Sequence, residues 1–260
     1  MAETALAPLS KGAAEGGGIS VLRIRTITIV ACLAGWELLA RSGLLYGEVV
    51  PPLEKVGAAF VELLVDADTY RHLAVTAWEV GAGFAAGFAA GVVLGVPMGA
   101  RRFFGDALTP YVNGFATAPK IVFLPIAMLA FGTGVTSKLA LGALSAFFPV
   151  VINTMAGVRQ IDPVLVKVGR SFRLTAPQMA TRIYLPALRR SLVTSMRLGF
   201  GLAVVGVLLA EIKLSAAGLG HLAIEHYNNF RVPQMYAVLI LVFVIAVGAN
   251  GLMARLMPRH

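Results

Sequence analysis

Long apolar segments separated by short polar stretches make up most of the chain. Six segments are of membrane-spanning length, at 26–45, 74–100, 107–131, 139–158, 192–214 and 235–253. A membrane-spanning helix needs about 20 mainly apolar residues. Before the second segment, positions 53–64 show the helical spacing of an amphipathic surface helix. The pattern predicts an all-α, polytopic membrane protein of about six transmembrane helices.

The longest polar segment with helical spacing, 162–186, lies between the fourth and fifth predicted spans. Its apolar residues recur at helical intervals, and the pattern breaks near Pro177, which predicts two short amphipathic helices joined by a turn. Helices of this kind dock into a groove of a partner protein or lie on the bilayer surface. The periodicity leaves both open, and a basic loop beside anionic headgroups can also be a simple topology signal.

The composition agrees with membrane embedding, because 58% of the 260 residues are hydrophobic and 13% are charged. A soluble domain carries about 25% charged residues. The formal net charge of +9 raises the possibility of nucleic-acid binding, but the basic residues cluster at the ends of the spans. With both termini in the cytoplasm, 14 of the 22 lysines and arginines fall on the cytoplasmic side. This bias follows the positive-inside rule and predicts no nucleic-acid partner.

The chain is expected to form one transmembrane domain, 21–260, after a disordered cytoplasmic tail, 1–20. The single cysteine, Cys32, allows no internal disulfide, and the four histidines are scattered. The sequence shows no metal-ligand cluster, no glycine-rich phosphate loop and no nucleophile motif. The residues therefore offer no candidate metal or cofactor site of these kinds.

The second predicted span carries a glycine at every fourth position, at 83, 87, 91, 95 and 99. Such spacing places all five on one face of a helix, where another helix backbone can approach closely. We interpret this ridge as a packing surface.

Three polar residues in or beside the spans are candidates for a translocation path, namely Lys120, Asn153 and Glu211. Lys120 lies in the third span, which Pro110, Pro119 and Pro125 interrupt. An ionisable residue inside a membrane is a functional hypothesis by default, and a lysine that snorkels from a kinked segment is the alternative.

Glu211 and two further acidic positions also have structural interpretations. For Glu211 the choice is between gating an external mouth and pairing with Lys213 or Arg231, and we favour the pair. Glu37 and Arg41 are spaced to pair along one helix. Glu79 is expected at the membrane interface.

The 159–190 loop resembles the EAA loop of bacterial ABC importer permeases, whose pattern is E-A-A, three residues, G, nine residues and I-x-L-P. The spacing fits throughout, and Lys167 and Arg173 stand where that family usually has glutamate and glycine. The resemblance implies an ATPase-coupling segment. Its residues are Lys167, Val168, Gly169, Arg170, Ser171, Phe172, Arg173, Ile183, Leu185 and Pro186.

Further runs at 118–132, 146–158 and 210–220 resemble nitrate, sulfonate and taurine importer permeases. The resemblance implies a multi-pass subunit of the bacterial inner membrane that works as a homodimer or beside a related permease. Its other partners would be a cytoplasmic ATPase that binds ATP and Mg²⁺ and a periplasmic or lipid-anchored substrate-binding protein. The solute would be a small organic or inorganic anion.

Two other functions stay open at this point. A polytopic membrane enzyme would use Glu79, Lys120 or Glu211 near a lipid headgroup, but clustered His, Asp or Ser motifs are missing from the sequence. An ATPase-independent channel or carrier is the second alternative, and the lack of an inverted sequence repeat counts against a carrier.

Overall fold

The computed structural model describes residues 21–44 and 49–255, and in these residues the regular elements are all helical. The predicted tail at 1–20 lies outside the described residues. The chain divides into two units, Met1–Leu53 and Glu54–His260. In the first unit, α1 (Val21–Arg41) contains the expected ion pair of Glu37 with Arg41. The second carboxylate oxygen of Glu37 accepts the backbone N–H of Leu53 at 3.0 Å.

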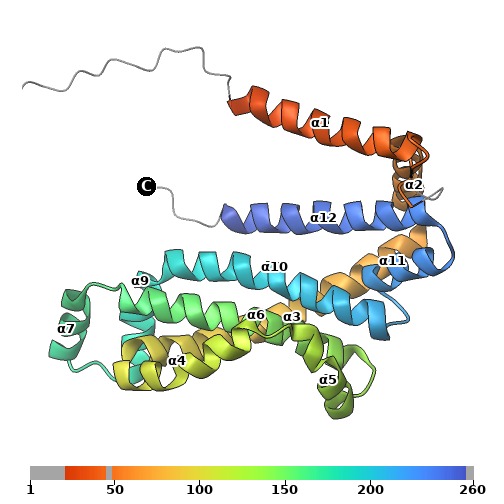
Figure 1. Ribbon diagram of the computed structural model, residues 1–260. Helices are drawn as coiled ribbons and strands as arrows, with labels where there is room; N and C mark the ends of the chain where they lie inside the picture. Colours follow the sequence, from red (N-terminus) through yellow and green to blue (C-terminus); the bar gives the residue numbers. More distant parts are fainter. Residues whose placement is uncertain (1–20, 45–48, 256–260) are drawn as a thin grey trace, which may run out of the picture. The chain divides into compact units, whose positions relative to one another are not determined.

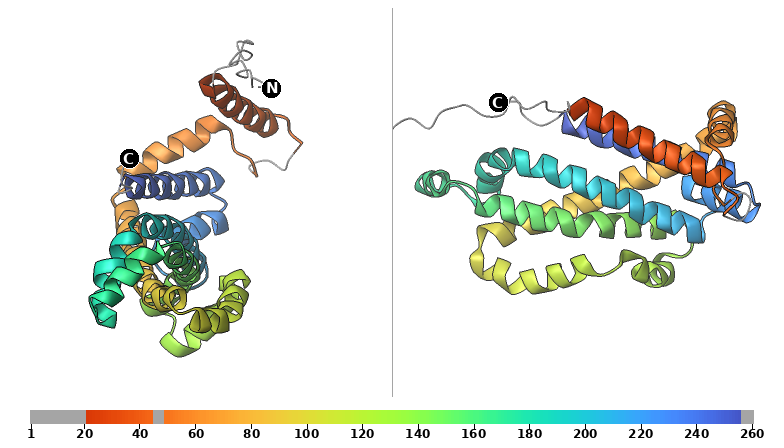
Figure 2. Two further views of the ribbon diagram at one scale, coloured as in Figure 1. Left: turned by 90° about the vertical axis from the view of Figure 1, so that its left-hand side faces the viewer. Right: turned by 45° about the horizontal axis from the view of Figure 1, so that its top comes forward.

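The second unit is organised around three long helices, α3 (Ala67–Ala100), α6 (Val135–Arg159) and α10 (Arg189–Leu214), which run side by side (Figures 1 and 2). The glycine ridge of α3 faces α6. A Cβ atom added at Gly87 would lie 2.3 Å from the carbonyl oxygen of Ala143, and one at Gly95 would lie 2.7 Å from Thr154 Cβ. The predicted packing role of the ridge is therefore confirmed.

A second apolar core joins α2 (Leu53–Val65), α11 (Leu219–Asn228) and α12 (Val232–Ala254) at the end of the unit opposite the 159–190 loop (Figure 1). The amphipathic helix expected at 53–64 is present as α2, and its buried residues are Val56, Ala59 and Leu63. The next helix, α3, begins seven residues before the predicted span. Asp66 caps it by accepting the backbone N–H of Asp68 at 3.2 Å, which satisfies one of the free donors of its first turn.

The third predicted span is broken once. It consists of α4 (Arg102–Thr117), the 3₁₀ turn η1 (Lys120–Phe123) and α5 (Leu124–Phe131), and the two halves meet at 95°. The bend falls at Ala118, which is extended before Pro119 because a proline disfavours helical backbone at the preceding residue. The expectation that all three prolines interrupt the span is wrong: Pro110 lies inside α4, and Pro125 lies in the first turn of α5.

Four described helices are long and apolar enough to cross a membrane, namely α3, α6, α10 and α12, and the bent α4–α5 pair is a fifth if it counts as one span. The polytopic all-α fold class is thus confirmed. Helix α1 covers residues 26–41 of the first predicted span but is not among these helices, so a total of six spans stays a prediction.

Candidate coupling site and polar residues of the spans

The 159–190 loop connects α6 to α10 through a series of short helices at one end of the unit (Figure 1). They are α7 (Pro163–Ser171), α8 (Ala176–Met179), the π turn η2 (Ala180–Tyr184) and α9 (Leu185–Ala187). Two helical segments joined by a turn were expected, but the turn lies at 172–175 and not near Pro177. Pro177 occupies the first turn of α8. Backbone N–H groups in a first turn make no intrahelical hydrogen bond, so a proline there costs none.

Helix α7 has a packed side and an exposed apolar side. Gly169 is buried against α8, and a Cβ atom there would lie 2.5 Å from the sulfur of Met179 and 3.3 Å from Ile183 Cγ1. On the exposed side the large apolar residues are Val164, Leu165, Val168 and Phe172, the last being 77% exposed. A short helix that turns four such residues outward has a surface suited to a protein partner.

Arg173 ends α7 in a left-handed conformation, with φ +52°. Its N–H donates to the carbonyl of Arg170 at 2.9 Å, and the N–H of Leu174 donates to the carbonyl of Gly169 at 3.1 Å. These two bonds define a Schellman motif, in which the left-handed residue is most often glycine. The importer pattern has glycine at this position, and the arginine of this chain adopts a backbone conformation that glycine favours and adds a charge.

The remaining motif residues follow in the same segment. Ile183 is half-buried, whereas Leu185 and Pro186 are exposed. The hydroxyl of Ser171 donates to the carbonyl of Lys167 at 3.1 Å, within α7. The π turn ends at Tyr184, two residues before Pro186.

Lys120 closes the bend of the third span. Its Nζ donates to the carbonyl oxygens of Phe115, Ala116 and Ala118 at 2.9, 2.8 and 2.7 Å. The ammonium group also lies 5.3 Å from the centre of the Phe148 ring. The lysine thus satisfies carbonyls that the interrupted helix leaves free, which is a structural use for an intramembrane cation.

Asn153 connects α6 to the start of α10. Its side-chain amide donates to the carbonyl of Pro149 at 2.8 Å, and its backbone carbonyl accepts the hydroxyl of Ser191 at 2.9 Å. Within the described residues no hydrogen bond or ion pair joins Lys120, Asn153 and Glu211 to one another. The structure therefore does not bring the three candidate path residues together.

Glu211 is completely buried and caps the start of α11. One carboxylate oxygen accepts the hydroxyl of Thr76 at 2.7 Å, and the other accepts the backbone N–H of Gly220 at 2.7 Å. Gly218 has φ +114°, and a Cβ atom there would lie 2.4 Å from this carboxylate. The expected pairing with Lys213 or Arg231 is wrong, because the carboxylate is turned inward toward α3 and α11.

Glu79 and Lys138 form an ion pair between α3 and α6 that the sequence did not reveal. Glu79 was expected at the membrane interface, but it is fully buried, and Lys138 is 4% exposed. The lysine Nζ also donates to the hydroxyl of Ser215 at 2.8 Å. This pair and the bonds of Glu211 connect α3, α6, α10 and α11 at the end of the unit opposite the 159–190 loop.

Comparison with known proteins supports one family. The profile of the family described as "binding-protein-dependent transport system inner membrane component" matches residues 87–260. The aliphatic sulfonates transport permease SsuC of Escherichia coli K12 is 30% identical over 230 residues, which cover 88% of this chain and 87% of SsuC. The taurine transport system permease TauC of the same organism is 25% identical, over 90% of this chain and 88% of TauC.

A more distant relative and a solved structure agree with this result. The nitrate import permease NrtB of Synechocystis is 30% identical over 166 residues, or 64% of this chain and 60% of NrtB. Among solved structures, an inward-facing form of the MetNI methionine ABC transporter is similar in fold. Its TM-score is 0.58 at 20% identity, and the match covers 75% of this chain and all of the compared chain.

Proposed function

The chain belongs to the family of binding-protein-dependent ABC importer permeases of the nitrate, sulfonate and taurine type, and we propose that its 159–190 loop is the segment that docks with the importer's ATPase. As a permease it is a multi-pass membrane protein and not an enzyme, since ATP hydrolysis takes place in a separate subunit. We assign ATP and Mg²⁺ to that ATPase alone.

The observation that carries this proposal is the exposed apolar side of α7. Val164, Leu165, Val168 and Phe172 face outward on a helix that also bears Lys167 and Arg170. An amphipathic helix of this kind fits a groove that has apolar pockets and acidic walls. Arg173 extends the basic surface, so the ATPase cleft is expected to carry acidic residues opposite it.

The orientation in the membrane follows from the charges. Both termini and the 159–190 loop are assigned to the cytoplasm, where 14 of the 22 lysines and arginines then lie. The opposite end of the unit, with Glu79, Lys138 and Glu211, faces the periplasm and a substrate-binding protein. The translocation path would form against a second permease copy or a related subunit.

The substrate class is inferred from the relatives. Their names specify aliphatic sulfonates, taurine and nitrate, which all carry an anionic group, so we propose a small organic or inorganic anion. Lys120 would add positive charge beside the path of such an anion, while its ammonium group donates to the carbonyls of the bend. Asn153 and Glu211 would act on the path indirectly, because their hydrogen bonds hold helices together.

The test is affinity purification of the tagged chain after co-expression with the ATPase and binding protein of its importer. Phe172→Ala should lower ATPase recovery at least tenfold, since a central aromatic anchor often contributes about 2 kcal/mol or more to binding. The matched control is Phe230→Ala, because Phe230 is also exposed just after the end of a short helix, in this case α11. Equal ATPase recovery with both variants would contradict the proposal.

Charge at the same surface gives an independent test. Arg173→Glu reverses one exposed charge and should weaken ATPase binding while the spans still fold, which size-exclusion chromatography of the detergent-solubilised chain would verify. Arg23→Glu, which also reverses an exposed arginine, is the control. Unchanged ATPase recovery with Arg173→Glu would contradict the expectation that the ATPase cleft carries acidic residues opposite Arg173.

A further inference from the structure

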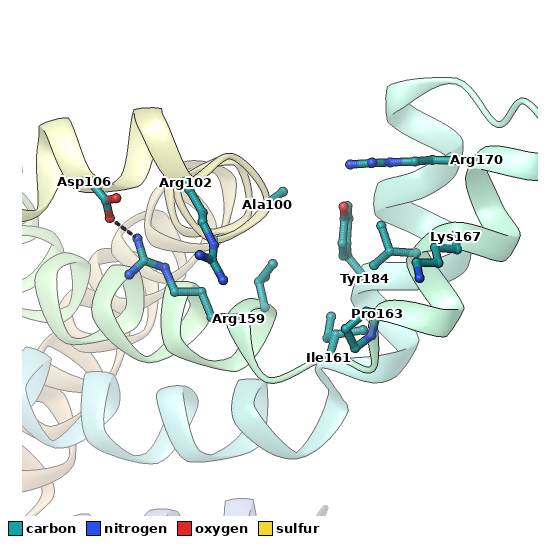
Figure 3. Close-up of a pocket in the computed structure, with 12 residues that line it drawn as sticks. Ala100, Arg102, Asp106, Arg159, Ile161, Pro163, Lys167, Arg170 and Tyr184 are labelled. Atoms are coloured by element: carbon teal, nitrogen blue, oxygen red, sulfur yellow. Dashed lines mark hydrogen bonds and ion pairs between the residues drawn. The ribbon is translucent and has the colours of Figure 1, made fainter.

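A cavity of about 470 Å³ lies between the end of the helical bundle and the 159–190 loop (Figure 3). Arg102 of α4 and Arg159 of α6 stand on one side of it, and Lys167, Arg170 and Tyr184 stand on the other. The Arg170 side chain extends across the opening toward Ala100, at the end of α3 (Figure 3). Three separate parts of the chain therefore direct cations toward one space.

The charges that line this cavity are not balanced. Asp106 is the only acidic residue among the lining side chains, and it pairs with Arg159 at 2.8 Å. Within the described part of the chain, Arg102, Lys167 and Arg170 have no acidic group within 4 Å. Like charges that face one another across a partly enclosed space repel, and a bound anion would remove that cost.

The position of Arg159 depends on close packing. A Cβ atom at Gly105 would lie 2.7 Å from the Nη2 atom of Arg159 and 2.2 Å from the carbonyl oxygen of Met98. Glycine at this position therefore lets the guanidinium lie directly against α4. On the opposite side, Asp162 fixes the start of α7 by accepting the N–H of Val164 at 2.8 Å. The two sides of the cavity are thus each anchored by local structure.

We propose that this cavity binds a phosphate group, supplied by an anionic phospholipid headgroup or by soluble phosphate. Guanidinium groups present paired N–H donors that match two phosphate oxygens, and three arginines line the space. The cavity lies at the ends of two spans, beside Gly99 of α3 and Val158 of α6, and the ends of membrane spans lie near the lipid headgroups. Basic pockets between spans at this depth hold phospholipid headgroups in membrane proteins.

A phosphate in this cavity would connect the coupling loop to the spans. It would bridge Arg102 and Arg159, at the ends of the bundle, to Lys167 and Arg170 of α7. Helix α7 would then move with the spans as one body. The proposal that phosphate binds is argued only from the residues of the cavity. Its effect on coupling rests on the proposed function.

The experiment is hydrogen exchange of residues 163–174 in the purified full-length chain. It compares detergent with chloride, detergent with inorganic phosphate at equal ionic strength, and nanodiscs of phosphatidylcholine with and without phosphatidylglycerol. Wild type should exchange more slowly with phosphate or with phosphatidylglycerol. In Arg170→Gln the apparent affinity should fall about tenfold, because a charge-assisted hydrogen bond contributes on that scale. Lys167→Gln provides a second variant on α7.

The matched control is Arg182→Gln, which removes the same charge from an exposed residue of the same loop that does not line the cavity. Protection by phosphatidylglycerol alone identifies a lipid, and protection by both ligands shows that soluble phosphate suffices. No protection, or equal loss in Arg182→Gln, overturns the proposal.

Loss of ATPase recovery in Arg170→Gln without any phosphate effect would assign the cations to the protein partner instead. If phosphate slows hydrogen exchange in a chain that does not co-purify with the ATPase, the phosphate site is supported and the proposed ATPase-docking function is rejected.

Discussion

The carboxylate of Glu79 and the ammonium of Lys138 form an ion pair between α3 and α6, with side-chain exposures of 0% and 5%. Each charge has lost its hydration, and each depends on the other for compensation. A buried pair of this kind adds little net stability compared with an apolar pair, but the loss of one partner leaves an unpaired charge in the interior. The pair therefore makes the packing of α3 on α6 sensitive to a change on either helix.

Lys138→Met should destabilise the folded chain by about 3–5 kcal/mol, because it leaves Glu79 buried and unpaired. The double variant Glu79→Gln with Lys138→Met should recover most of that loss. Thermal unfolding in detergent measures both. Arg41→Gln, which removes the exposed partner of Glu37, should cost less than about 1 kcal/mol. A double variant no more stable than Lys138→Met would show that the lysine acts through packing and not through its charge.

The sequence predicted features that depend on one helix and missed those that depend on two. The glycine ridge of α3 is visible in one helical period, and α6 packs on it as expected. The ion pair of Glu79 with Lys138 depends on which turn of α3 lies beside which turn of α6. The pattern of apolar residues within each helix does not specify that alignment. For the same reason Glu211 was assigned to nearby cations, although its partners come from α3 and α11.

The 159–190 loop was predicted in outline for a similar reason. Its amphipathic spacing and basic residues are local properties, and both helices are present. The position of its turn is set by the Schellman motif at Arg173, which involves a conformation that arginine rarely adopts. Pro177 was therefore a misleading signal, because proline fits the first turn of a helix as well as it fits a break.

Gly87→Ala should destabilise the chain by about 1–3 kcal/mol, since the added methyl group would overlap the backbone of Ala143 and force α3 away from α6. Gly81→Ala is the matched control on the same helix. A Cβ atom at Gly81 meets nothing within 4 Å, so this variant should be neutral or stabilising by up to about 1 kcal/mol. Thermal unfolding of the two variants in detergent tests the ridge, and equal melting temperatures would argue against it.

His226 should make the chain less stable in mild acid. Burial lowers the pKa of its imidazole from 6.5, nearby Arg231 and His72 act in the same direction, and Glu225 and Glu62 oppose them. As the pH falls from 6.5 through the folded-state pKa, the unfolded chain binds a proton more readily than the folded chain, so the free energy of unfolding decreases. His226→Gln should show a weaker decrease between pH 7.5 and 5. Identical pH dependence of the two unfolding curves would contradict the assignment.

Arg173→Gly should stabilise the end of α7, because glycine adopts φ +52° without the penalty of roughly 1 kcal/mol that other residues incur. Exchange of the Leu174 amide, which donates to Gly169 in the Schellman motif, should slow about two- to fivefold, a change that corresponds to about 0.4–1 kcal/mol. Arg173→Ala is the control, since it removes the charge but keeps the strained backbone. Faster Leu174 exchange in Arg173→Gly than in Arg173→Ala would contradict this account. If the charge of Arg173 also contacts the ATPase, both variants should bind it less tightly, so the two measurements separate the effect of the turn from the effect of the charge.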